Sequence, residues 1–340
     1  MKRLGIGVWG VGRIGYLHAA HVRSSTEKAE LIAVADPIKK LAIATAKKLG
    51  CRMYETPIKM LKEESLDAVI IATPTQMHTE HVELASERNV PMLLEKPIAL
   101  SLYEADKIVS AVRQSQVKFQ LGFNRRFDIG YSKAKKMIAK GRIGKAILVK
   151  TCARDPQPPP EEYIRRSGGI FVDECIHDID IALWFMNSEV EQVWATGTTL
   201  VYPQFAKYGD FDNAVAVLRF RNGGLGVVEG SRTSRYGYDL RTEVLGDQGA
   251  VHVDNLRKES MELWRQQGAT KQPCPWFIER FAEAYRSEIQ GFCDYVSKGG
   301  KSPVSVEEGR AALQVALAAR ESAEKKRAIT IHHEMKTKPS

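Results

Sequence analysis

Short apolar runs alternate with segments of helical periodicity along the first third of the chain. The runs are rich in Val, Ile, Leu and Ala, a pattern typical of parallel strands that helices cover on both faces. The predicted strands span Leu4–Trp9, Leu31–Ala35, Ala68–Ala72, Met92–Leu94 and Lys118–Gly122. The intervening segments predict amphipathic helices at Arg13–Ser24, Ile38–Leu49, His78–Arg88 and Leu102–Ser115, the last with a capping box of Ser101 and Glu104. Residues 1–123 are therefore predicted to form a doubly wound α/β domain with a parallel sheet.

The pattern changes after residue 123. Several strand-like segments now follow one another closely, and Asn222-Gly223 between two of them is a hairpin signal. The predicted strands are Ala146–Ala153, Val190–Val201, Ala214–Arg221, Leu225–Arg232, Asp239–Leu245, Ala250–Val253, Met261–Arg265 and Ala328–Ile331. The predicted helices are Ser132–Lys140, Phe171–Met186, Trp276–Ser297 and Val306–Lys325. Because hairpins join antiparallel strands, residues 124–340 are predicted to form an α+β domain with a large, mainly antiparallel, open sheet.

Composition excludes several classes of protein. The net charge of +9 comes from 50 Lys+Arg against 41 Asp+Glu, but the basic residues are scattered and no nucleic-acid-binding motif accompanies them. We therefore expect no nucleic-acid partner. No apolar run reaches about 18 residues and no secretory signal is recognisable, so we expect a cytoplasmic protein without a membrane partner.

The five cysteines are dispersed, odd in number and free of any Cys-x-x-Cys pair. This usage favours neither a disulfide framework nor a tetrahedral metal site. We expect no metal, and we interpret Cys175 as a small buried hydrophobic residue.

A glycine-rich turn follows the first predicted strand and opens the first predicted helix. Its residues are Gly10, Val11, Gly12, Arg13, Ile14 and Gly15. The first glycine permits a tight turn, the second lets the backbone approach a pyrophosphate, and the third allows close packing of helix and strand. The free N–H groups at the helix start attract phosphates. The motif predicts a Rossmann-type dinucleotide site.

The second predicted strand ends at Asp36, 21 residues after Gly15. A carboxylate there accepts hydrogen bonds from a ribose diol and repels a 2′-phosphate, which favours NAD over NADP. Lys39 and Lys40 lie close by in the chain and leave NADP open as the less favoured cofactor.

Two further segments follow predicted strands at the carboxyl edge of the parallel sheet, where such sheets bind ligands. Thr73-Pro74-Thr75 leads into His78, which either contacts the cofactor or caps the next helix. Glu95-Lys96-Pro97 follows the next strand. Lys96 would then meet substrate and nicotinamide, where an ammonium group can stabilise negative charge on a reacting oxygen.

Asp173 and His177 are four residues apart in the predicted helix Phe171–Met186, so their side chains are expected to share a face. A carboxylate beside an imidazole orients the ring and stabilises the imidazolium that forms when it takes a proton. Oxidation of a secondary alcohol needs such a base. The pair is therefore predicted to be catalytic, with a merely helix-stabilising pair as the alternative, and the absence of a third ligand at suitable spacing argues against a metal.

Together these motifs resemble the glucose–fructose oxidoreductase/inositol dehydrogenase (Gfo/Idh/MocA) family. In the first half the resemblance is carried by Gly10–Gly15, Thr73–His78, Glu95-Lys96-Pro97 and Gly122-Phe-Asn-Arg-Arg-Phe127. In the second half Arg154-Asp155-Pro156, Ser167–Asp173, Ile176-His177-Asp178 and Ser231–Arg241 look like the inositol 2-dehydrogenase branch. The resemblance spans essentially the whole chain.

The resemblance implies roles for individual residues. The catalytic group would be Lys96, Asp173 and His177. The cofactor would contact Gly10, Gly12, Arg13, Ile14, Gly15, Asp36, Thr73, Pro74, Thr75, His78, Glu95 and Lys96. The substrate would contact Lys96, Arg126, Asp155, Asp173, His177 and Tyr236.

The resemblance also implies an activity, the NAD-dependent oxidation of a cyclic polyol, with myo- or scyllo-inositol giving an inosose. A pyranose or anhydrosugar dehydrogenase is the nearest alternative, because sugars and inositols present similar rings of hydroxyl groups. A non-catalytic NAD-sensing regulator is the second alternative, since fold alone does not decide function. We expect a homo-oligomer, with a tetramer implied by the family, because apolar side chains on the broad sheet need cover. Those side chains are Val215, Val217, Leu225, Val227 and Val228.

Overall fold

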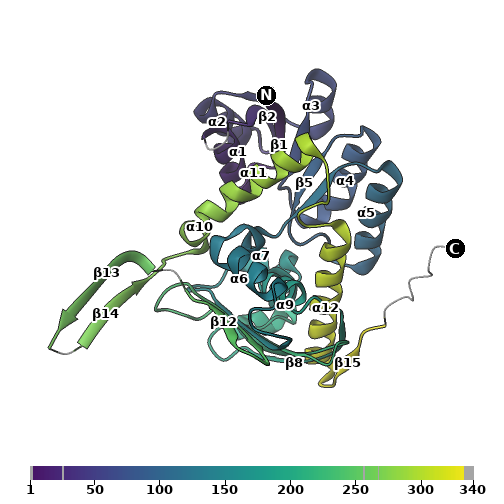
Figure 1. Ribbon diagram of the computed structural model, residues 1–340. Helices are drawn as coiled ribbons and strands as arrows, with labels where there is room; N and C mark the ends of the chain where they lie inside the picture. Colours follow the sequence, from purple (N-terminus) through teal and green to yellow (C-terminus); the bar gives the residue numbers. More distant parts are fainter. Residues whose placement is uncertain (1–2, 25–26, 256, 267, 333–340) are drawn as a thin grey trace. The chain divides into compact units, whose positions relative to one another are not determined.

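The computed structural model describes residues 3–24, 27–255, 257–266 and 268–332. These residues fold into two compact units, each assembled from two segments of the chain (Figure 1). Unit 1 comprises residues 1–129 and 281–313, and unit 2 comprises residues 130–280 and 314–340. Of the predicted domains, residues 1, 2 and 333–340 lie outside the described part.

Unit 1 is built on a parallel sheet of six strands in the order β3-β2-β1-β4-β5-β6. Along the chain the strands are β1 (Leu4–Trp9), β2 (Ala29–Ala35), β3 (Arg52–Tyr54), β4 (Ala68–Ile71), β5 (Met92–Glu95) and β6 (Phe119–Gly122). The strand order reverses between β1 and β4, so the carboxyl ends of these two strands open the crevice in which doubly wound sheets bind ligands. The predicted fold class of the first half is confirmed.

The helices of unit 1 connect these strands. They are α1 (Arg13–Ser24), α2 (Lys39–Leu49), α3 (Pro57–Glu63), η1 (Thr75–Met77), α4 (His78–Glu87), α5 (Leu102–Ser115), η2 (Asn124–Phe127) and α11 (Ala282–Lys298). Ser101 is the N-cap of α5, as predicted. The Glu104 N–H donates to Ser101 Oγ, and the Ser101 hydroxyl donates to Glu104 Oε2 at 2.8 Å.

Unit 1 includes α11, although α11 lies far from the other helices in sequence. Ile289 and Phe292 of α11 join the core cluster of Ile6, Val8 and Val34, and α11 packs against α1. Burial of this apolar helix face is why the chain returns to unit 1 after forming six of the seven strands of the sheet of unit 2. The domain prediction has a single boundary after residue 123, whereas unit 1 also includes residues 281–313.

Unit 2 is built on a seven-stranded sheet in the order β12-β11-β7-β10-β9-β8-β15. Along the chain these strands are β7 (Ala146–Arg154), β8 (Val190–Thr198), β9 (Asn213–Phe220), β10 (Leu225–Ser231), β11 (Asp239–Gly246), β12 (Ala250–Val253) and β15 (Ile329–Thr330). All neighbours pair antiparallel except β7 and β10, which run parallel. The predicted mainly antiparallel sheet is confirmed, and β13 (Arg257–Arg265) and β14 (Gly268–Pro273) form a separate hairpin.

One face of this sheet is covered by helices and the other is exposed. The helices of unit 2 are α6 (Ile129–Ala139), α7 (Glu161–Ser167), α8 (Ile170–Asp173), α9 (Ile176–Met186), η3 (Pro203–Tyr208), α10 (Phe277–Arg280) and the second half of α12 (Val306–Lys325). α9 packs on β7 and β10. Along β9, Ala214, Ala216 and Leu218 are buried while Val215 and Val217 are exposed, as the two-residue period of a strand requires.

No helix in the described ranges is long and apolar enough to cross a membrane.

Candidate active site

The glycine turn between β1 and α1 requires glycine at two positions for steric reasons. Gly10 has a φ of +80°, and a Cβ there would lie 2.6 Å from the Ala72 carbonyl oxygen. A Cβ on Gly15 would lie 1.9 Å from the carbonyl oxygen of Gly10. At Gly12, by contrast, a Cβ would meet nothing within 4 Å. The backbone at Gly12 therefore faces open space at the N-terminal end of α1, a site that suits a pyrophosphate.

Asp36 follows β2 and is tied to the glycine turn. Its Oδ2 accepts a hydrogen bond from the N–H of Val11 at 2.9 Å, and its Oδ1 accepts one from the N–H of Ile38 at 2.9 Å. A carboxylate offers about four acceptor positions, so each oxygen retains one for a ribose hydroxyl. Lys39 pairs with Glu55 at 3.0 Å, which reduces its availability to a 2′-phosphate. These residues fit NAD, and Arg13 and Ile14 stand in the first turn of α1.

His78 begins α4 and bridges two loops of unit 1. Its Nδ1 lies 2.9 Å from the carbonyl oxygen of Pro97, and its Nε2 lies 3.1 Å from that of Thr73. Burial lowers the pKa of His78, although the carbonyl groups act in the opposite direction. A neutral imidazole has a single N–H, so the ring donates to one of these two carbonyl groups, and it lies between the Thr73–Thr75 segment and the turn after β5. Contact between His78 and the cofactor stays a prediction.

Lys96 directly follows β5, and its bond to Pro97 is cis. The backbone N–H of Lys96 donates to Glu95 Oε2 at 3.1 Å, and Glu95 Oε1 lies 2.5 Å from His18 Nε2. Glu95 is buried and Lys96 is half-buried. The carboxylate of Glu95 therefore supports the backbone of Lys96. Contact of Glu95 and of Lys96 with the cofactor stays a prediction.

Arg126 lies in η2 of unit 1 and is buried. Its Nη1 donates to Glu308 Oε1 at 2.6 Å, in the first turn of α12. The pKa of Glu308 is lowered because Arg126 and the Ser305 groups outweigh the opposing effect of burial. The guanidinium thus has a carboxylate partner within unit 1, and its contact with substrate stays a prediction.

In unit 2 the parallel pair β7 and β10 brings several polar residues to one edge of the sheet. Arg154, the last residue of β7, pairs with Ser231 at the end of β10, and the next residue, Asp155, donates its N–H to the Ser231 carbonyl at 2.7 Å. Tyr236 belongs to the same edge, because Arg154 donates to its hydroxyl at 3.0 Å and that hydroxyl donates to Asp239 at 2.7 Å. Asp155 and Tyr236, both predicted substrate ligands, are thereby brought to one edge.

Asp173 and His177 do not share one continuous helix, and this part of the prediction is wrong. Asp173 ends α8, and His177 is the second residue of α9. Between them the Cys175 N–H donates to the Ile170 carbonyl and the His177 N–H donates to that of Glu174, so the regular helical ladder is interrupted. This turn packs closely against β10, since a Cβ on Gly230 would lie 2.4 Å from Cys175 Sγ.

Asp173 is held by two groups on other elements. The hydroxyl of Tyr163, on α7, donates to Asp173 Oδ1 at 2.8 Å, and Arg232 Nη2 lies 3.8 Å from Asp173 Oδ2. Cationic and hydrogen-bonding neighbours favour the ionised form of a carboxyl group. Asp173 is therefore a held, negatively charged group beside the start of α9.

Arg232 is 1% exposed and is surrounded by carboxylates. Its Nη1 donates to Asp210 Oδ2 at 2.5 Å, and its Nε lies 3.5 Å from Glu174 Oε2. Burial raises the pKa of Glu174 well above its usual range, Asp155 and Asp173 raise it further, and Arg232 opposes them. A buried guanidinium needs such partners, and here they fix the segment from Asp173 to Cys175.

Sequence reasoning did not single out Tyr163, Glu174 or Asp210, and it quoted Arg232 only within a motif. One signal for the charges around Arg232 was available, because Arg232 ends a predicted strand. An arginine that is buried needs acidic partners. Which acids supply that charge depends on tertiary contacts with the Asp210 loop, which spacing does not reveal.

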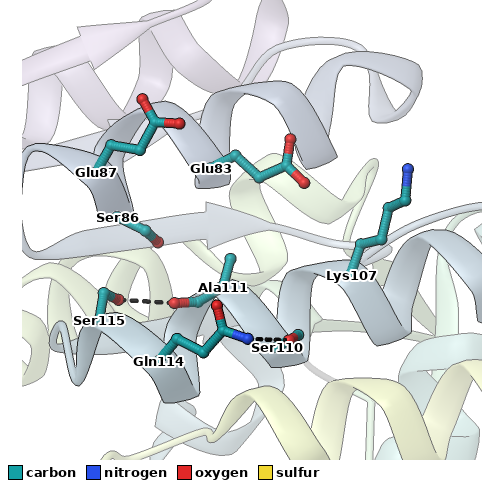
Figure 2. Close-up of a pocket in the computed structure, with 8 residues that line it drawn as sticks. All are labelled: Glu83, Ser86, Glu87, Lys107, Ser110, Ala111, Gln114 and Ser115. Atoms are coloured by element: carbon teal, nitrogen blue, oxygen red, sulfur yellow. Dashed lines mark hydrogen bonds between the residues drawn. The ribbon is translucent and has the colours of Figure 1, made fainter.

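A groove of about 470 Å³ lies between α4 and α5 of unit 1 (Figure 2). It is lined by Glu83, Ser86, Glu87, Lys107, Ser110, Ala111, Gln114 and Ser115. It contains none of the predicted site residues, and the chemistry of the site does not extend into it.

Fold and site define an NAD-dependent oxidoreductase acting on CH–OH donors: a doubly wound nucleotide domain is joined to a sheet domain that carries a held carboxylate and a histidine. Family models agree with this class. "Oxidoreductase family, NAD-binding Rossmann fold" matches residues 4–123, and "GFO/IDH/MocA C-terminal domain" matches residues 131–252. The chain belongs to the Gfo/Idh/MocA oxidoreductase family.

Relatives of known name match over most of the chain. It is 38% identical over 328 residues to the myo-inositol 2-dehydrogenase of Thermotoga maritima, covering 96% of this chain and 98% of that protein. It is 40% identical over 317 residues to the scyllo-inositol 2-dehydrogenase (NAD(+)) of Bacillus subtilis, covering 93% and 92%. The crystal structure of scyllo-inositol dehydrogenase from Lactobacillus casei with bound NAD(H) and scyllo-inositol superimposes with a TM-score of 0.90 at 29% identity, covering 97% and 99%.

Proposed function

We propose that the protein oxidises one secondary alcohol of a cyclic polyol, myo- or scyllo-inositol, to the corresponding inosose with NAD. The substrate class comes from the named activities of relatives that align over nearly the whole chain. The observation that carries the proposal within this chain is the carboxylate of Asp173, which Tyr163 and Arg232 hold at the start of the helix that bears His177. Such a carboxylate can orient an imidazole base.

In the proposed reaction, bound NAD supplies a hydride acceptor. His177 takes the proton of the reacting hydroxyl group, and Asp173 stabilises the imidazolium that results. The Nζ of Lys96 donates to the same oxygen and stabilises the negative charge that develops on it. The C–H bond breaks, its hydrogen leaves with both electrons, and the carbon–oxygen double bond forms. The products are a ketone, NADH and one proton.

The other hydroxyl groups of the substrate would bind to Asp155, Tyr236 and Arg126. Asp155 is suited to this role because a carboxylate accepts hydrogen bonds from two neighbouring hydroxyl groups. Tyr236 is 57% exposed and its ring can cover one face of a polyol. In this proposal residues 1–123 bind NAD, and residues 124–340 bind substrate and form the subunit interface.

A pyranose or anhydrosugar dehydrogenase is the alternative with the same chemistry, and an NAD-sensing regulator is the alternative without it. The discriminating experiment mixes the purified protein with NAD and, separately, with myo-inositol, scyllo-inositol, glucose and an anhydrosugar, and follows NADH absorbance. Turnover confined to inositols supports the proposal. Preferential turnover of a sugar selects the first alternative, and NAD binding without any turnover selects the second.

We further propose a homotetramer assembled through the exposed face of the sheet in unit 2. That face carries partly exposed apolar side chains on four strands, and association would bury them. They are Trp194, Val215, Val217, Leu225 and Leu245, whereas Val228, predicted to contribute, is 1% exposed and lies in the core. Light scattering at micromolar concentration tests this proposal, and a monomer mass would contradict it.

A cytoplasmic location is part of the same proposal. It rests on the free state of all five cysteines, each of which is in the described ranges, because reducing compartments keep thiols unpaired.

A further inference from the structure

Unit 1 contains a cluster of three buried titratable side chains directly behind the Lys96 turn. His18 of α1, Glu95 of β5 and Glu288 of α11 present ligand atoms that all lie within 4.8 Å of one another. His18 and Glu288 are 0% exposed and Glu95 is 8% exposed. The reaction proposed above does not use Glu288.

The two carboxyl groups differ in their hydrogen-bond donors. Glu95 has a donor at each oxygen, because Oε1 lies 2.5 Å from His18 Nε2 and Oε2 accepts the Lys96 N–H at 3.1 Å. Neither oxygen of Glu288 has a hydrogen-bond partner among the described residues. Two carboxyl groups this close in an apolar interior do not both ionise. The negative charge therefore belongs to Glu95 and the proton to Glu288.

The remaining titratable groups nearby agree with this assignment. Burial raises the pKa of Glu288 well above its usual range, and the Glu95 carboxylate raises it further. His78 on α4 interacts with the charge of Glu95, but burial lowers the pKa of His78. His21 on α1 faces His18, and burial lowers the pKa of His21 to about 4. At neutral pH these two histidines add no positive charge to balance a second carboxylate.

A divalent cation could also neutralise the cluster, but the geometry argues against one. Ligand atoms of a single zinc ion lie about 3.4 Å apart, because each sits about 2.1 Å from the metal at tetrahedral angles. His18 Nε2 and Glu95 Oε1 are only 2.5 Å apart, which is a hydrogen-bond distance. Glu95 and His18 thus already satisfy each other through a proton.

We propose that Glu288 is a positioning residue that holds a proton beside Glu95, and that this neutral acid, with His18, keeps the Glu95 carboxylate in place under the backbone of Lys96. The proposal rests on the function proposed for Lys96. A second negative charge at position 288, or the loss of the side chain there, displaces Glu95 and with it the end of β5 from which Lys96 extends.

The first experiment reads the proton directly and needs no substrate. Infrared difference spectroscopy of the apo protein at neutral pH compares wild type with Glu288→Gln. The carbonyl stretch of one protonated carboxyl group should be present in wild type and absent from the variant. Glu283→Gln is the matched control, because Glu283 is a glutamate on the same helix whose side chain is 81% exposed.

The second experiment tests positioning. Glu288→Ala should lower kcat about tenfold or more while the Kd for NAD stays within about twofold, because removal of the neutral acid beside Glu95 shifts the position of Lys96. Glu288→Gln is neutral and similar in volume to the protonated acid, so it should keep kcat within about threefold of wild type. A purely structural role would instead lower Tm in both variants and leave kcat intact below that temperature.

Three results would overturn the proposal: an unchanged infrared spectrum in Glu288→Gln, wild-type kcat in folded Glu288→Ala, or one equivalent of tightly bound divalent metal that Glu288→Gln loses. If wild type oxidises no polyol, the proposed function fails, whereas the infrared measurement still decides where the proton resides.

Discussion

The phenolic hydroxyl of Tyr163 donates a 2.8 Å hydrogen bond to Oδ1 of Asp173. Tyr163 is 45% exposed, so water can partly replace this bond when the hydroxyl is removed. Arg232 approaches the other oxygen of Asp173 from the protein interior. Tyr163, on a surface helix, thus orients the carboxylate, and the buried guanidinium of Arg232 stabilises its negative charge.

Tyr163→Phe should lower kcat/KM for the polyol about threefold to tenfold, the range expected for one net hydrogen bond. Tyr208→Phe is the matched control, since the Tyr208 hydroxyl bonds to Glu161 rather than to Asp173. Steady-state kinetics of both variants measures the effect. Wild-type kcat/KM in Tyr163→Phe would mean that Arg232 alone suffices to hold Asp173.

The glycine turn offers a pair of variants that separate binding from folding. Gly12→Ala places a methyl group in open space, so Tm should change little, while the Kd for NAD should rise about tenfold or more because the methyl group obstructs the pyrophosphate. Gly15→Ala forces a Cβ to within 1.9 Å of the Gly10 carbonyl oxygen and should lower Tm. Calorimetry for NAD binding and thermal melting decide both outcomes, and tight NAD binding by Gly12→Ala would place the pyrophosphate elsewhere.

Asp36 is expected to decide the choice of cofactor. Wild type should show the higher kcat/KM with NAD, and Asp36→Asn should reduce the NAD/NADP ratio about tenfold or more, since a charged acceptor for the ribose is lost. Lys39→Gln should move the ratio less than about twofold, because Lys39 is an exposed partner of Glu55 and such pairs contribute little. A wild-type preference for NADP would refute the assignment of Asp36.

Two buried histidines make unit 1 sensitive to acid. Burial lowers the pKa of His21 and of His81 from 6.5 to about 4. Each histidine is therefore neutral in the folded state, whereas in the unfolded chain it takes up a proton below pH 6.5. The free energy of unfolding therefore keeps its full value above pH 6.5 and falls progressively between pH 6.5 and 4. In urea unfolding at several pH values, His21 and His81 should together account for about two of the protons taken up in this window, and His78, whose pKa burial also lowers, should add to them.

His81→Gln should remove about one of those protons from the pH dependence. His252→Gln is the control, because it replaces a histidine whose side chain is 63% exposed. Equal pH dependence in wild type and His81→Gln would show that His81 is not buried as a neutral ring.

Continuous apolar strands and well-capped helices were predictable from the sequence. Leu4–Trp9, Arg13–Ser24 and Leu102–Ser115 begin and end as predicted, because their signals are local. β3 and α3 were missed. β3 is a three-residue edge strand with one buried side chain, which is too short for a periodicity. α3 did carry a start signal, since Thr56 caps it and Pro57 opens it.

The glycine turn was predictable from the sequence, because its residues are consecutive and each is required by the local backbone. The contacts between charged residues that are far apart in the sequence were not predictable. The single helix predicted over Phe171–Met186 is interrupted because Glu174 accepts the Ser231 N–H and lies against the buried Arg232. That interaction joins residues 57 positions apart, and only the folded sheet edge brings them together. The same limit explains why Glu288 was overlooked, although its helix was predicted.

His177 is expected to be the base, and its loss should affect chemistry rather than cofactor binding. General-base catalysis contributes about 10²–10⁴-fold, so His177→Ala should lower kcat by an amount in that range. The Kd for NAD should change little, because the glycine turn that is predicted to bind NAD belongs to unit 1 and His177 belongs to unit 2. Lys96→Ala should also lower kcat strongly, because it removes the charge at the reacting oxygen. The double variant should be little worse than the more impaired single variant, since residues that act as a unit lose their contribution together. His252→Ala is the control for the loss of an imidazole from unit 2. Wild-type kcat in His177→Ala at saturating polyol would end this assignment and leave Lys96 as the group that receives the proton.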